Sequence, residues 1–92
     1  MRDKPDSETI AETLKEIRCG DSQAKAGRRL GWSPGVWGHL EQGRTALSVE
    51  KAEWIVTVFK PSDALAARLI SAARREGQRK LMASLARREG NV

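Results

Sequence analysis

A chain of 92 residues has room for one domain with a modest core and not for two. Its 17 basic and 12 acidic residues give a formal charge of +5, which suits a polyanionic partner such as nucleic acid, although charge alone does not identify one. Because the sequence has one cysteine, one histidine and no spacing typical of metal ligands or catalytic groups, we expect no intrachain disulfide, no metal or cofactor, and no enzymatic activity.

The first two predicted helices each have a recognisable beginning and end. Apolar residues recur at spacings of four and three over residues 7–18, which is one face of a helix, and a glycine follows. The second helix is predicted at about residues 22–30, because Ser22 can cap it and Gly31 can end it. Residues 1–6 are polar and are expected to form a flexible arm before the first helix.

The third and fourth helices follow the same pattern. The third is predicted at about residues 33–42, with Ser33 as its cap and Pro34 at the first helical position, where a missing N–H costs nothing. Ser48 begins the fourth, which ends before Pro61 because the residue before a proline avoids the helical region. These four helices define a predicted domain at residues 7–60.

Residues 61–92 are predicted to be a helical extension, either one long helix bent at Gly77 or two helices. Part of its apolar face is expected to be spare once the core of the domain has formed. We therefore predict that the extension makes a dimer interface through four residues, Leu65, Leu69, Ile70 and Ala73. The alternative is that this face only packs on the domain. Since no strand alternation appears, the predicted fold is all-α, a compact five-helix domain with an extended C-terminal helix.

The stretch of residues 23–44 carries the functional signal. Two short helices joined by a three-residue turn cross steeply, so the second can project and enter the major groove of DNA. The stretch resembles the helix-turn-helix of the lambda-repressor/Cro (XRE) family at several spaced positions, which are Ser22, Gln23, Ala26, Leu30, Gly31, Ser33, Trp37, Leu40, Glu41, Gly43, Arg44 and Ser48. The resemblance spans about residues 10–59 and implies a compact five-helix DNA-binding domain.

The resemblance also implies which residues meet DNA. Base contacts would come from the recognition helix, through Ser33, Pro34, Gly35, Gly38, His39 and Gln42. Phosphates would be held by Ser22, Gln23, Arg28 and Arg44. A solvated surface position is the alternative for Arg28 and for His39. Glu41 is expected to be structural and to fix the loop after the recognition helix.

This chain departs from the family pattern mainly around the recognition helix. Positions that are usually long and polar are occupied by Pro34, Gly35 and, one turn later, Gly38. Trp37 stands where the family usually has Val or Ile, and Gly27 stands where it usually has Ala. We expect Gly27 to permit close packing against Trp37, and we expect both Trp37 and Trp54 to lie in the core.

Together these features predict a sequence-specific transcription regulator that binds an operator in double-stranded DNA as a homodimer, similar to Cro-type repressors, controller proteins or regulators of mobile elements. Two alternatives remain open. One is an antitoxin whose C-terminal helix binds a toxin or another protein, and the other is an interaction module that has lost DNA binding. Without a signal-peptide pattern or an apolar stretch near the roughly 20 residues that span a bilayer, we expect a cytoplasmic protein that does not bind membranes.

Overall fold

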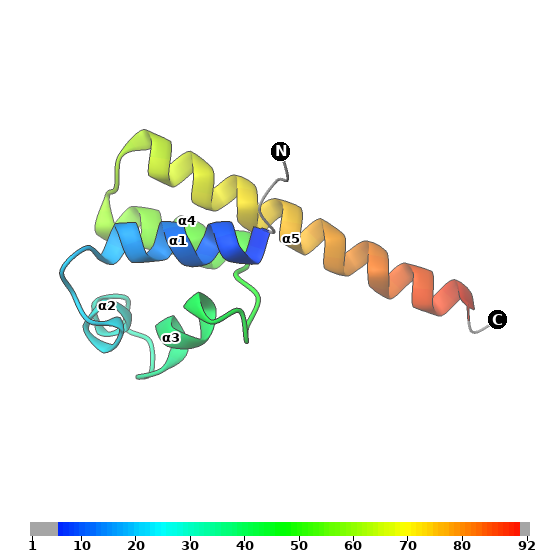
Figure 1. Ribbon diagram of the computed structural model, residues 1–92, viewed down its shortest axis with the longest axis horizontal. Coiled ribbons are helices and arrows are strands. Elements are labelled where there is room, and N and C mark those ends of the chain that lie inside the picture. The colour runs from blue at the N-terminus through cyan, green and yellow to red at the C-terminus, as the bar shows by residue number, and fades with distance from the viewer. Residues whose placement is uncertain (1–5, 91–92) are drawn as a thin grey trace.

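The computed structural model describes the backbone of residues 6–90 and the side chains of residues 8–85. Helices and no strands occur in this part of the chain, which confirms the all-α fold (Figure 1). In chain order the helices are α1 (Asp6–Arg18), α2 (Gln23–Arg29), α3 (Val36–Glu41), α4 (Val49–Phe59) and α5 (Asp63–Gly90). Apart from Asp6, which begins α1, the predicted N-terminal arm lies outside the described residues.

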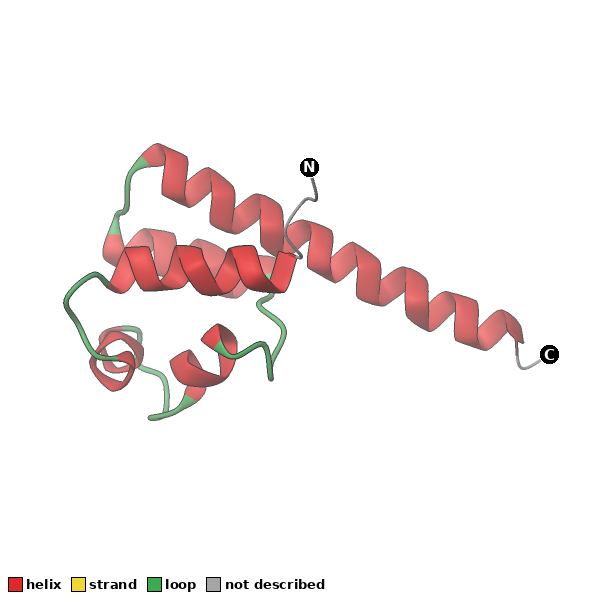
Figure 2. Ribbon diagram, in the orientation of Figure 1, coloured by secondary structure: helices red, strands yellow, loops and turns green. Residues whose placement is uncertain are grey.

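Helix α1 lies between the other elements. It packs against both α5 and α3, and Figure 1 shows α2 and α3 on one side of it and the first half of α5 on the other. Helix α4 packs against α5. Figure 2 shows the loops that join successive helices. All five helices and the loop after α3 contribute to one core, which consists of Ile10, Leu14, Ile17, Ala26, Leu30, Trp37, Leu40, Leu47, Ala52, Ile55, Leu69, Ala72 and Ala73.

Serine side chains cap α2 and α4, as the sequence predicts, and also α5, where the Ser62 hydroxyl accepts from the backbone N–H of Leu65 at 3.3 Å. The Ser22 hydroxyl accepts a hydrogen bond from the backbone N–H of Lys25 at 3.1 Å, at the start of α2. At the start of α4, the Ser48 hydroxyl accepts from the backbone N–H of Lys51, also at 3.1 Å. Each cap satisfies an amide that has no partner within its own helix.

The tryptophans differ in their environments. Trp37 is fully buried and is the largest side chain of the core, as expected. The prediction that Trp54 is also buried is wrong, because its side chain is 46 % exposed. Its indole Nε1 donates to the backbone carbonyl of Leu30 at 3.0 Å, so the ring bridges α4 and the end of α2 at the surface. The polar edge of the ring therefore finds a partner without entering the core.

Helix α5 is continuous through Gly77, so the described extension is one helix and not two. Its 28 residues correspond to about 42 Å of helix, which accounts for most of the 49 Å longest dimension of the molecule. The first half packs on the domain and the second half projects away from it (Figure 1). Of the helices described, none has the length and apolar character needed to cross a membrane.

The residues predicted to form a dimer interface need correction. Leu69 and Ala73 are 0 % and 1 % exposed, because they face the core of their own domain where α5 packs on α1 and α4. Leu65 and Ile70 are partly buried against the same core. The alternative considered for this face, packing on the domain, therefore describes it better than a surface left free for a second subunit.

Candidate nucleic-acid interface

The connection from α2 to α3 begins with a well-defined helix end. Gly31 adopts a φ of +76°, and its N–H donates to the carbonyl of Arg28 at 3.0 Å. The N–H of Trp32 donates to the carbonyl of Gly27, also at 3.0 Å. This pair of bonds is the Schellman motif, in which a left-handed residue reverses the chain and satisfies the last carbonyls of the helix. The motif fixes the direction in which the chain leaves α2.

The recognition helix is shorter than the predicted range of residues 33–42. Gly35 has a φ of +104°, which is outside the helical region, so α3 begins after it at Val36. The N–H of Val36 donates to the carbonyl of Ser33 at 3.2 Å. Residues 33–36 therefore form a turn with Pro34 second and Gly35 third, the positions that a type II turn favours for these residues. Neither Ser33 nor Pro34 has the predicted role of cap or first helical residue.

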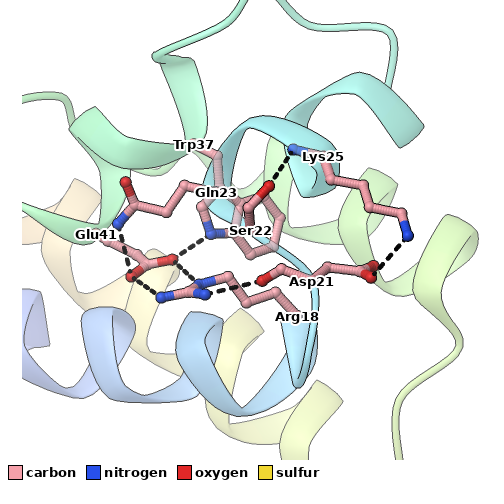
Figure 3. A network of polar contacts seen from close by, with 7 residues as sticks. All are labelled: Arg18, Asp21, Ser22, Gln23, Lys25, Trp37 and Glu41. Carbon is pink, nitrogen blue, oxygen red and sulfur yellow. Dashed lines mark hydrogen bonds and ion pairs between the residues drawn. The ribbon is translucent and has the colours of Figure 1, made fainter.

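The inner side of α3 is held by a buried carboxylate, Glu41, whose side chain is 2 % exposed. Arg18 of α1 donates to it twice, from Nε at 2.7 Å and from Nη2 at 3.3 Å. The amide Nε2 of Gln23 on α2 donates to it at 3.2 Å, and the indole N–H of Trp37 donates from within α3 (Figure 3). Glu41 is structural as predicted, but its partners are three helices and not the loop after α3.

These hydrogen bonds fix the relative positions of the helices that form the helix-turn-helix. A buried carboxylate is stable only when its oxygens have charged or polar partners, and Glu41 has donors on both oxygens. Sequence reasoning missed Arg18 in this role, because a basic residue in the last turn of α1 is ordinary. The signal that could have found the network is the spacing of Trp37 and Glu41, which are four residues apart on one helical face.

The outer side of α3 is exposed. His39 lies on it, Gln42 is exposed directly after α3 as its C-cap, and the preceding turn exposes three further predicted base contacts, Ser33, Pro34 and Gly35. The sixth, Gly38, is buried and faces the Gln23 side chain. Gly38 is therefore not on the surface that DNA would meet, which corrects its predicted role.

The predicted phosphate contacts also differ in their accessibility. Arg28 and Arg44 are exposed, and within the described part of the chain neither has an ion-pair partner. The Ser22 hydroxyl is exposed but caps α2, and the Gln23 side chain is half-buried and bound to Glu41. The structure therefore offers two unpaired guanidinium groups on the segments that flank α3.

Gly27 lies where α2 packs against α3, but the packing does not require a glycine there, contrary to expectation. A Cβ on Gly27 would lie 3.7 Å from the Cβ of Trp37, so the backbone of α2 lies close to this buried tryptophan. This separation is an ordinary van der Waals contact, so the space would also accept the alanine that is usual in the family.

The comparison with known families agrees with this geometry. A family model described as a helix-turn-helix domain matches residues 9–69, about two thirds of the chain. No curated protein and no solved structure shows significant similarity to the sequence. The match covers α2, the turn and α3 together with the helices that support them, and it is consistent with the resemblance to the lambda-repressor/Cro pattern. The chain therefore belongs to the helix-turn-helix domain family.

Proposed function

We propose that this protein is a sequence-specific regulator of transcription that binds an operator in double-stranded DNA. The observation that carries the proposal is the two-sided character of α3. Its inner side is fixed by the bonds to Glu41, while its outer side exposes His39 and its C-cap residue Gln42 is exposed as well. The major groove is wide enough for a helix, and imidazole and amide groups can donate to or accept from base edges there.

Charge supports the same function. Arg28 on α2 and Arg44 after α3 are exposed, and they precede and follow the recognition helix in the sequence, where they would be available to DNA phosphates. The backbone position of Arg44 is well defined, because its N–H donates to the carbonyl of His39 at 2.9 Å. Contacts of this kind position a protein on DNA, whereas His39 and Gln42 would supply the sequence preference.

Selection from a random pool of double-stranded DNA at roughly physiological salt tests the proposal. We expect one enriched motif, and we expect His39→Ala or Gln42→Ala to relax the preference at particular base pairs. Arg44→Ala should weaken binding to all sequences and reduce the slope of log affinity against log salt by about one. Arg74→Ala, which removes an exposed charge from α5, is the matched control and should change neither the affinity for DNA nor the salt slope. Recovery of no motif would contradict sequence-specific binding.

We further propose that the protein binds its operator as a homodimer, with the two recognition helices about 34 Å apart on an inverted repeat. The projecting half of α5 supports this, because it carries most of the large apolar side chains that are exposed in the described part of the chain. Leu81 is 60 %, Met82 65 % and Leu85 42 % exposed. Sedimentation equilibrium with Leu81→Ser and Met82→Ser combined tests the surface. A wild-type protein that stays monomeric at high concentration, alone and on DNA, would contradict it.

The same apolar surface also favours a second candidate function, an antitoxin or another regulator whose C-terminal helix binds a different protein. The segment has six basic residues and two acidic ones over residues 74–92. Two copies of it therefore repel each other, whereas an acidic partner would be attracted. Monomeric protein on DNA in the sedimentation experiment would favour this function over the homodimer. Failure to select any DNA sequence would favour an interaction module without DNA binding.

A further inference from the structure

Gln23, the first residue of α2, directs its side-chain amide into the protein, toward α3. The nitrogen Nε2 donates to Glu41 at 3.2 Å. The oxygen Oε1 lies over Gly38 of α3, so closely that a Cβ on Gly38 would be 2.9 Å from Oε1 and 3.7 Å from Cδ. Figure 3 shows the side chain directed toward Glu41. Gln23 therefore spans the gap between α2 and α3 rather than pointing to solvent.

Gly38 has no conformational reason to be glycine. It lies within α3, and it is not among the residues with positive φ. Glycine is one of the least favourable residues inside a helix, so local structure alone favours another residue at this position. The close approach of Gln23 supplies the missing reason, because real Cβ atoms essentially never come within 3.0 Å of a neighbouring atom. A methyl group at position 38 would therefore require the amide of Gln23 to move from this place, which the flexible side chain can do only by changing its bond to Glu41.

We propose that Gln23 is a positioning residue for the recognition helix and that Gly38 is the contact on which it acts. This inference rests on the proposed function, since it concerns the surface that would read DNA. His39 follows Gly38 directly and Gln42 follows Glu41 directly, so the two anchoring points are adjacent to the two candidate base-reading residues. A displaced Gln23 would let α3 shift relative to α2 and would misalign both side chains with the bases.

Three variants test the contact, namely Gly38→Ala, Gln23→Ala and the two combined. In Gly38→Ala the new methyl group displaces the amide from Glu41. In the double variant the methyl group enters space that the shortened side chain has left. We expect each single change to lower affinity for the selected operator by about tenfold, the cost of a lost base contact, and the double variant to lose no more than either single one. Binding to unrelated DNA should be unchanged.

A glycine-to-alanine change elsewhere in the protein is the matched control. Gly77 lies in α5 and a Cβ there would meet nothing within 4 Å. Gly77→Ala should therefore raise the unfolding midpoint through helix propensity and leave operator affinity unchanged. A Gly38→Ala effect of equal size in the wild type and in the Gln23→Ala variant would overturn the proposal, because the loss would then not act through Gln23. No loss of affinity in any variant would also overturn it.

Urea unfolding of the same variants without DNA separates this inference from the proposed function. With Gln23 present, the alanine methyl group breaks the bond to Glu41 and offsets the gain in helix propensity. In the Gln23→Ala background only the gain remains, so Gly38→Ala should raise the midpoint more there than in the wild type. If no operator can be selected but this coupling is present, the proposed function fails and the contact stands. If the coupling is absent, the proposed role of the contact between Gln23 and Gly38 is wrong, whatever the result of the DNA-binding experiments.

Discussion

Breaking the Arg18–Glu41 pair from its two sides should have unequal effects on the free energy of unfolding. Arg18→Met leaves a carboxylate whose side chain is 2 % exposed with only Gln23 and Trp37 as donors. Removing one partner of a buried pair costs about 3–5 kcal/mol. The Arg18 side chain is 22 % exposed, so water can partly reach the pair and we expect the lower end, about 3 kcal/mol. For a domain of this size that corresponds to a fall of more than about 10 °C in Tm.

Glu41→Gln is the gentler change. It leaves a charged Arg18 that is partly solvated and still donates to the carbonyl of Asp21 at 2.9 Å. The new amide oxygen can continue to accept from Trp37. We therefore expect a loss of about 1–2 kcal/mol, comparable with losing a hydrogen bond to a charged group.

Combining Arg18→Met with Glu41→Gln removes both charges together and leaves neither one buried alone. The double variant should therefore be more stable than Arg18→Met, although simple addition of the single losses gives about 4–5 kcal/mol. Urea unfolding followed by circular dichroism measures all four proteins, and equal slopes of the transitions would show that the comparison is valid. Losses that add within about 0.5 kcal/mol would refute the coupling that we derive from the geometry.

Three further changes test helix ends and the surface tryptophan by the same unfolding assay. Ser48→Ala removes the hydroxyl that caps α4 and should cost about 1 kcal/mol, so an unchanged midpoint would contradict the capping role. Lys60→Gly should raise stability by about 0.5–1 kcal/mol, because Lys60 ends α4 at a φ of +50° where a side chain is strained, and a lower midpoint would show that the lysine side chain contributes more than the strain. Trp54→Phe keeps an aromatic ring but replaces the indole by a smaller phenyl group without the bond to Leu30, and should cost about 1 kcal/mol. A loss below about 0.3 kcal/mol would mean that water replaces that bond fully.

The sequence predicts those parts of the fold that depend on neighbours within one helix. Caps at Ser22 and Ser48 and the end of α2 at Gly31 are local, because their hydrogen bonds close within five residues. The start of α3 was harder to predict, since a Pro-Gly pair suits both the first turn of a helix and a type II turn. Gly35 adopts the turn conformation, and the adjacent residues do not distinguish between the turn and the helix.

The geometry of the candidate site depends more than the helix ends do on contacts between different helices. The sequence pattern of an apolar residue at helical spacing is the same whether the residue faces the core or a partner. The burial of Leu69 and the exposure of Trp54 therefore follow only from how α5 and α4 pack. Gln23 begins a helix in the sequence, which suggests a free amide for phosphate. Its inward direction depends on Glu41 and Gly38, which lie on another helix and could not be placed beside it beforehand.

The bond between Trp37 and Glu41 also gives the protein an intrinsic optical label. The fluorescence of a buried indole responds to its hydrogen bond and to nearby charge, and Trp37 is fully buried in the first turn of the helix that would read DNA. Replacing Trp32 and Trp54 by phenylalanine leaves Trp37 as the only emitter, since the chain has three tryptophans and no tyrosine. In such a protein a change in emission on adding DNA would report a change in the bond from Trp37 to Glu41 or in the charge around it, without an attached dye.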